Sequence, residues 1–100
     1  MYESRSKVIK LNDSSFKRDR LKLSSISFRK LSFVMFYADW CPHCVNSEKT
    51  WTNFAKTVDR RVAVCVVDCV RYPELANSLG VSGYPTIKIF NKSGILLGDY

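Results

Sequence analysis

The sequence predicts an α/β domain in which a central mixed β-sheet is flanked by helices. Two apolar runs, Leu31–Ala38 and Val62–Val67, have the composition of strands that are buried on both faces. Each run is followed by a stretch of helical character, and helical crossovers between strands favour parallel pairing. The chain closes on a hairpin, whose strands are antiparallel. With 100 residues, we expect a single domain over residues 1–100.

The N-terminal third is predicted from turn residues and a short apolar run. In chain order we expect a flexible start, a strand, a turn, a short helix and a connection: residues 1–6, Val8–Leu11, Asn12–Asp13, Phe16–Leu21 and Ser24–Lys30. Residues 17–30 would therefore form a basic helix and loop.

Helical spacing and turn residues predict the rest of the chain. Trp51, Phe54, Ala55 and Val58 fall on one face of a helix that Arg60-Arg61 closes. The later elements are a helix from Pro73 to Gly80, a turn over residues 82–85, a strand over Thr86–Phe90 and a hairpin partner at Ile95–Leu97.

The net charge of +7 is carried by the N-terminal third of the chain. Basic side chains outnumber acidic ones by nine to three in residues 1–30, and by seven to six in residues 31–100. A basic arm can attract nucleic acid or anionic lipid, but a solvated helix face with a loop explains it more simply. No aromatic RNA-binding signature accompanies the charge, so nucleic acid is not expected as a partner.

Targeting signals are the next feature. No stretch approaches the ~18 apolar residues of a membrane span, so we expect no membrane association. Residues 1–10 lack the apolar segment of a secretory signal, and the final Gly-Asp-Tyr is no retention signal. We therefore expect a cytoplasmic, reducing location, where a Cys-x-x-Cys is more often catalytic or metal-binding than structural. The oligomeric state stays open.

Cys41-Pro42-His43-Cys44 is the chemically informative motif. At a helix start the two cysteines share one face, and the unpaired N–H groups and the dipole favour a Cys41 thiolate. Cys44 lies deeper and can donate its S–H to Cys41, while Pro42 suits the first turn. A protonated His43 would stabilise the thiolate further. Cys41 would attack a substrate disulfide, and Cys44 would resolve the mixed disulfide.

Three segments resemble the thioredoxin family, including the thioredoxin domains of protein disulfide isomerases. They are Phe36–Cys44, which is similar to the active-site strand and loop, Val81–Thr86, which is similar to the cis-proline loop, and Lys7–Leu11 with Phe16, which is similar to the first strand and helix. The resemblance covers residues 7–100. It implies a thioredoxin fold and a protein disulfide oxidoreductase without a bound cofactor.

The resemblance also implies a binding surface and partners. Pro85 would follow a cis peptide bond, and Tyr84, Pro85 and Thr86 would hold an extended substrate by strand addition. Trp40 and Pro42 would line the same surface. Substrates would be protein disulfides, and electrons would pass to or from a dithiol reductase or glutathione.

The chain also departs from the family pattern. Met35 stands where the family carries a buried Asp or Glu that is thought to shuttle a proton for the second cysteine. The Cys-Pro-His-Cys tetrapeptide is similar to that of periplasmic disulfide oxidases. The family's last helix is missing from the sequence.

Cys65 and Cys69 lie outside the Cys41–Cys44 motif. Cys65 is expected to be a small buried core residue, and Cys69 to lie at the exposed end of its strand, where it is either inert or a second redox thiol. The spacing of the four cysteines is not that of a zinc knuckle, so no metal is expected.

The alternatives to an oxidoreductase are a redox-inactive peptide-binding module that uses the cis-proline groove, and a protein associated with metal or nucleic acid.

Overall fold

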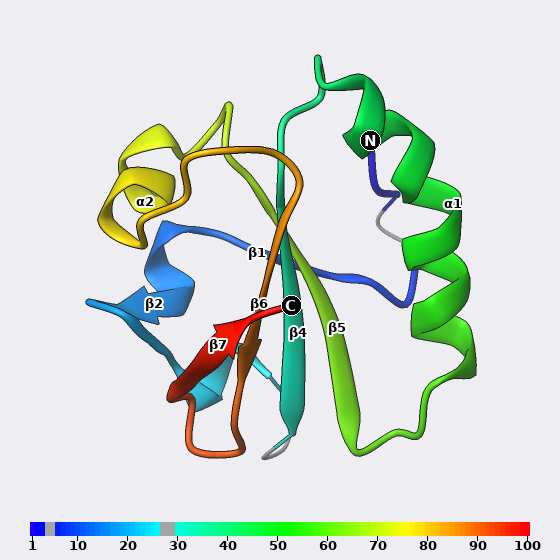
Figure 1. The fold of residues 1–100 in the computed structure, drawn as a ribbon. Coiled ribbons are helices and arrows are strands. Elements are labelled where there is room, and N and C mark those ends of the chain that lie inside the picture. Colours follow the sequence, from blue (N-terminus) through cyan, green and yellow to red (C-terminus); the bar gives the residue numbers. More distant parts are fainter. Residues whose placement is uncertain (4–5, 27–29) are drawn as a thin grey trace.

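Figure 1 shows the computed structural model of the chain, which describes residues 1–3, 6–26 and 30–100. A five-stranded sheet has the order β1-β5-β4-β6-β7. Its strands are β1 (Ile9–Leu11), β4 (Leu31–Tyr37), β5 (Val62–Asp68), β6 (Thr86–Phe90) and β7 (Leu96–Asp99). The other elements are the helices α1 (Pro42–Thr57) and α2 (Pro73–Ser78), the short strands β2 (Phe16–Lys17) and β3 (Arg20–Leu21), and the 3-10 turns η1 (Asp13–Ser15) and η2 (Leu23–Ser25).

The sheet is mixed, and the two apolar runs form its centre. β4 and β5 are parallel, with Leu31 opposite Val62 and Tyr37 opposite Asp68, and β1 pairs with β5 in the same direction. β6 runs antiparallel to β4, and β7 antiparallel to β6. Central strands are covered on both faces, so their alternate side chains enter two different cores.

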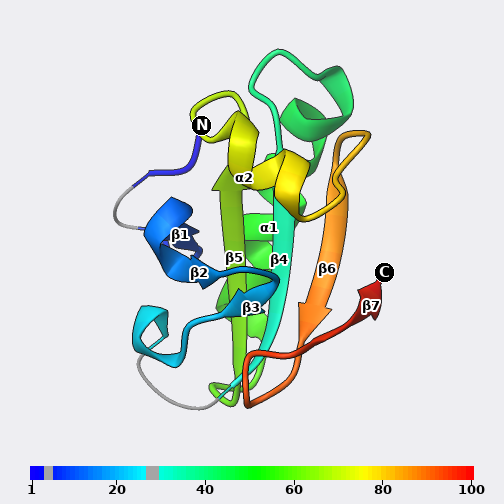
Figure 2. The ribbon, with the colours of Figure 1, turned by 90° about the vertical axis from the view of Figure 1, so that its left-hand side faces the viewer.

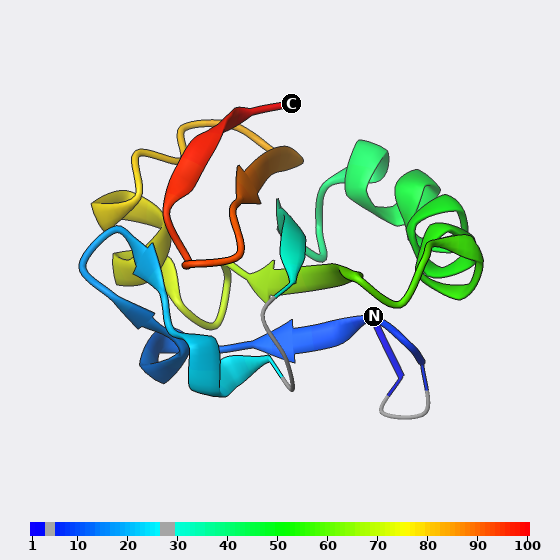
Figure 3. The same ribbon diagram turned by 90° about the horizontal axis from the view of Figure 1, so that it is seen from below.

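Helices and a small hairpin cover the two faces of the sheet in separate layers (Figure 3). Helix α1 covers one face, and the indole Nε1 of Trp51 donates to the Cys65 carbonyl at 3.0 Å, which ties α1 to β5. The α1-side cluster consists of Tyr2, Val8, Met35, Tyr37, Ala38, Cys41, Cys44, Trp51, Val64 and Val66. Helix α2 and the β2–β3 hairpin cover the other face (Figure 2), where Phe16, Val34, Phe36, Val67, Leu75 and Phe90 are among the core residues.

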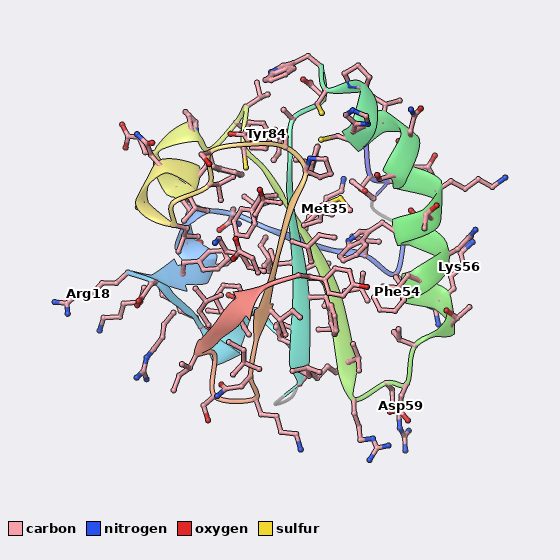
Figure 4. All side chains as sticks on the ribbon, in the orientation of Figure 1. Arg18, Met35, Phe54, Lys56, Asp59 and Tyr84 are labelled. Carbon is pink, nitrogen blue, oxygen red and sulfur yellow. The ribbon has the colours of Figure 1, made fainter. Side chains whose placement is uncertain are left out.

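The prediction of a short helix over Phe16–Leu21 is wrong. These residues form β2 and β3, in which Phe16 pairs with Leu21, and Arg18 at the turn has a left-handed φ of 58°. Both Phe16 and Leu21 are buried. Five residues along a helix would point them about 140° apart, whereas a hairpin pair puts both on one face. The basic side chain of Arg18 projects from the hairpin tip (Figure 4).

Elsewhere the predicted elements are present, with boundaries that shift by a few residues. Asn12 caps η1 by accepting from the Ser14 N–H at 2.9 Å. Helix α1 ends at Thr57 rather than at the arginines, and the last strand is β7. Tyr2, in the segment expected to be flexible, is buried against Tyr37, while residues 4–5 of that segment lie outside the described residues.

The predicted fold class is confirmed. The sheet is mixed and flanked by helices, and the described residues contain two α-helices, with none after β7. The same part of the chain has no helix with the length and apolarity needed to cross a membrane.

Candidate active site

Cys41 and Cys44 lie where β4 leads into helix α1. Cys41 is the N-cap residue of α1, with extended φ and ψ of −86° and 119°, and Pro42 begins the first turn. The Cys41 carbonyl accepts from the Val45 N–H at 3.0 Å, which closes that turn. Cys44 has no exposed surface, and Cys41 retains 6%. One thiol therefore reaches the surface while the other lies behind it.

The environment separates the two thiols in acidity. A hydrogen bond from the Cys44 side chain, then the backbone N–H groups of Cys44 and His43, lower the pKa of the Cys41 thiol. Burial in the α1-side cluster raises the pKa of the Cys44 thiol to about 11. Cys41 is therefore the stronger acid of the two thiols, and Cys44 keeps its proton to higher pH.

The loop before β6 lies directly over Cys41. Its Tyr84–Pro85 peptide bond is cis, as the family resemblance implies. The Cys41 thiol donates to the Tyr84 carbonyl at 3.5 Å, and the Tyr84 ring meets the Trp40 indole edge-on, with 6.0 Å between ring centroids. Thr86 donates from its hydroxyl to the Gly83 carbonyl at 2.6 Å, which holds the loop in shape.

Cys69 lies beneath this loop and is buried, so the expectation of an exposed thiol at the end of its strand is wrong. Its N–H donates to the Tyr37 carbonyl at 2.8 Å, and only 4% of its surface is exposed. Burial raises the pKa of the Cys69 thiol to about 11, and a hydrogen bond with the Tyr84 side chain opposes that rise. Cys69 thus supports the Tyr84 side chain from below, and Cys65, with no exposed surface, is a core residue as predicted.

Two tyrosines pack in the α1-side cluster that also contains Cys44. The Tyr2 hydroxyl donates to the Met35 sulfur at 3.8 Å, and the Tyr2 and Tyr37 rings meet edge-on at 5.4 Å. Figure 4 shows Met35 between the sheet and α1, below Tyr84. Burial, and next the Glu48 charge, raise the pKa of Tyr2, while burial with the charges of Asp68 and Asp39 raises that of Tyr37 to about 12.

The structure brings most of the predicted site residues together. Cys41, Cys44, Trp40, Tyr84 and Pro85 meet at one end of the sheet. His43 is exposed on the first turn of α1 and contributes to the Cys41 site through its backbone N–H. Among the residues that the structure describes, no group of three or more His, Cys, Asp or Glu side chains is arranged to hold a metal ion.

The comparisons with known proteins agree with this geometry. The sequence profile of the family described as Thioredoxin matches residues 7–99. This chain belongs to the thioredoxin family. Its thioredoxin-fold neighbours include the solution structure of the first thioredoxin domain of mouse protein disulfide-isomerase A4, with a TM-score of 0.74 and 33% identity over 98% of this chain and 66% of that one. The J-Trx1 fragment of ERdj5 aligns with a TM-score of 0.75 and 30% identity over 94% of this chain and 43% of that one.

Similar full-length proteins are considerably longer. Protein disulfide-isomerase A6 of Homo sapiens is 36% identical over 100 residues, which are 100% of this chain and 22% of that protein. A probable protein disulfide-isomerase ER-60 of Schistosoma mansoni is 36% identical over 102 residues, covering 99% of this chain and 20% of the relative. This chain therefore spans about a fifth of the length of these relatives.

Several residues of the site were not predicted from the sequence. Tyr2 and Tyr37 share a buried cluster with Cys44 and come from two separate segments. No local pattern links a tyrosine at position 2 to a strand more than thirty residues later.

Proposed function

We propose that this domain is a thiol–disulfide oxidoreductase that exchanges disulfides with protein substrates through Cys41 and Cys44. The proposal rests above all on the opposite pKa shifts of two thiols one helical turn apart. Cys41 is the stronger acid at the surface, and Cys44 is the protected thiol behind it. Such a pair can open a disulfide and then release the product.

The chemistry proceeds in two exchanges. The Cys41 thiolate attacks one sulfur of a substrate disulfide, which forms a mixed disulfide and releases the other substrate sulfur as a thiolate. Cys44 then loses its proton and attacks Cys41, so that the Cys41–Cys44 bond forms and the substrate leaves reduced. The reverse sequence oxidises a substrate dithiol. Glutathione or a dithiol reductase would restore the starting form.

The surface around Cys41 suits an extended polypeptide. The exposed Trp40 indole packs against the Tyr84 ring. Pro42, which follows Cys41, and Pro85 and Thr86, which follow Tyr84, would add to this surface. A substrate strand laid along the Tyr84–Thr86 loop would bring its disulfide to Cys41.

Dithiol-dependent reduction of insulin tests this function. We expect turnover by the native chain and none by Cys41→Ser, while Cys44→Ser should form a mixed disulfide and stop there. Cys65→Ala, a cysteine variant in the core, serves as the control and should retain turnover. Peptide binding without turnover in the native chain would identify a redox-inactive peptide-binding module instead.

A further inference from the structure

The outer face of the β2–β3 hairpin is basic. Phe16 and Leu21, which are paired across the two strands, both enter the core. Because side chains alternate along a strand, the next pair, Lys17 and Arg20, points to solvent, and both residues are exposed. Arg18 projects from the tip between them (Figure 4). A helix would have spread these cations around its axis, whereas the hairpin gathers them at one place on the surface.

These side chains border one open space. A surface depression of about 520 Å³ is lined by Lys17, Arg18, Asp19 and Arg20. Lys22, two residues after Arg20, is exposed as well. None of the four cations forms an ion pair within the described part of the chain. The hairpin therefore presents four cationic side chains and a single carboxylate, that of Asp19, to a partner.

Two features of the hairpin oppose its stability. Lys17 and Arg20 lie directly opposite each other across the strands, and like charges in this position repel. Arg18 adopts a left-handed φ of 58°, which glycine and asparagine adopt more readily. The scaffold is nevertheless fixed, because the Leu21 N–H donates to the Gly94 carbonyl at 2.9 Å. Local choices that oppose stability on a firm scaffold are typical of functional sites.

The spacing of the cations suits carboxylates on an extended chain. The Lys22 N–H donates to the Ser15 carbonyl at 2.8 Å, which continues the ladder one residue beyond β3. Arg20 and Lys22 are therefore about 6.5–7 Å apart along extended backbone, as are alternate side chains of any other strand. A guanidinium binds a carboxylate bidentately, and an ammonium binds it as a point charge. An acidic strand with a carboxylate at every second residue can meet both cations in register.

Other anionic partners have fewer matching groups on this surface. Single-stranded nucleic acid is bound by cations together with aromatic rings on which its bases stack, and Phe16, the aromatic residue of the hairpin, is buried. An anionic membrane is bound by cations together with exposed apolar side chains that enter it. The apolar residues of the hairpin, Phe16 and Leu21, are both buried. The hairpin therefore favours an acidic polypeptide over a nucleic acid or a membrane.

We propose that the outer face of the β2–β3 hairpin is a docking surface for an acidic, extended polypeptide segment. Arg20 and Lys22 bind alternate carboxylates of the segment, and Lys17 and Arg18 bind further carboxylates at the tip. Arg18 and Tyr84 lie well apart (Figure 4), so the surface is separate from the loop over Cys41. The docking surface can therefore hold a partner protein independently of the thiol chemistry.

Fluorescence anisotropy with a fluorescein-labelled peptide of alternating glutamate and serine tests the proposal. We expect saturable binding that weakens as salt is added, and no binding of the matching glutamine–serine peptide. The double variant Lys17→Glu/Arg20→Glu should bind the acidic peptide at least about tenfold more weakly, because an exposed ion pair is worth up to about fivefold in affinity and each reversal adds repulsion.

The control variant Lys49→Glu/Lys56→Glu makes the same change in net charge on helix α1, where both lysines are exposed. Lys56 projects from the opposite side of the molecule to Arg18 (Figure 4), so this variant should keep the native affinity. Equal binding by the native chain and Lys17→Glu/Arg20→Glu, or an equal loss in the control variant, would overturn the proposal. Tighter binding of a single-stranded oligonucleotide of equal charge, or of vesicles that contain phosphatidylserine, would overturn it as well.

The single variant Lys17→Glu separates docking from a structural role. It places opposite charges across the hairpin, so its midpoint of urea unfolding should rise while its affinity for the acidic peptide falls. A purely structural role would move both quantities in the same direction. A lower urea midpoint together with the lost affinity would therefore make the effect structural and contradict the proposal.

Discussion

The four cysteines should differ sharply in their reaction with iodoacetamide, because only the thiolate reacts. A thiol with a pKa of 9.0 is ~1% thiolate at pH 7, and the Cys41 pKa is lowered from that value, so Cys41 exceeds this fraction. Cys44 and Cys69, with pKa values of about 11, are ~0.01% thiolate by the same relation. Ionisation alone therefore favours Cys41 by at least about 100-fold.

Nucleophilicity offsets part of this advantage. The reactivity of a thiolate falls as its pKa falls, with a Brønsted slope of ~0.4–0.5, so a pKa difference of ~2 makes the thiolates of the weaker acids up to about tenfold more reactive. We expect Cys41 to react at least about tenfold faster than Cys44, Cys65 or Cys69, a ratio that their burial increases. A short iodoacetamide pulse at pH 7, followed by unfolding, labelling with a heavy reagent and peptide mass spectrometry, gives all four rates in one sample.

A variant checks the cause of the difference. Cys44→Ala removes the thiol that donates to Cys41, the largest contribution to its lowered pKa. The pH midpoint of Cys41 alkylation should then move upward, while Cys65→Ala should leave it in place. Equal labelling of Cys41 and Cys69 in the native chain, or an unchanged midpoint in Cys44→Ala, would refute the reasoning.

Other predictions concern stability, each measured by urea unfolding. The free energy of unfolding should fall above about pH 8.5 by ~1.4 kcal/mol per pH unit for each buried thiol. Burial raises the pKa of a thiol such as Cys65, so the thiol keeps its proton in the folded state to higher pH than in the unfolded chain. A free energy of unfolding that stays constant up to about pH 10 would contradict this. Gly94→Ala should lose more than ~1–2 kcal/mol, since φ is +81° there and a Cβ would collide with the Leu21 carbonyl. Asp99→Asn should cost ~1–3 kcal/mol because it leaves the buried Lys88 ammonium without its 2.7 Å partner, and Lys88→Met should cost less; the opposite order would contradict the account.

Much of the fold could be predicted because its strongest signals are local. The runs that became β4 and β5 are apolar throughout, as strands covered on both faces must be. Trp51 and Phe54 carry a clear helical spacing, and Pro42 and Pro73 begin the two helices. The hairpin at residues 16–21 was not predicted, because its two-residue strands are too short to show the alternation of apolar and polar residues that marks a strand. Its conformation depends on Phe16 and Leu21 reaching the same core.

The candidate site was predictable only where a contiguous motif encodes it. The acidity difference between Cys41 and Cys44 follows from a helix start, which four residues define. The supports of the site come from distant segments that meet only in the folded chain. Cys69 contacts the Tyr84 side chain from the end of β5, and Tyr2 packs against Met35 and Tyr37 from the N-terminal segment. Such contacts depend on the topology of the sheet, which a single sequence does not specify residue by residue.

The reduction potential of the Cys41–Cys44 pair tests the central claim most directly. Equilibration in glutathione buffers, followed by Trp40 fluorescence and thiol labelling, should show one two-electron transition that both Cys41→Ser and Cys44→Ser abolish. The stabilised Cys41 thiolate favours the reduced form, so the midpoint should lie well above the −270 mV of ordinary thioredoxins and nearer about −180 mV. No transition, or one that persists in Cys41→Ser, would contradict the account, and a midpoint at or below about −270 mV would make the domain a reductase.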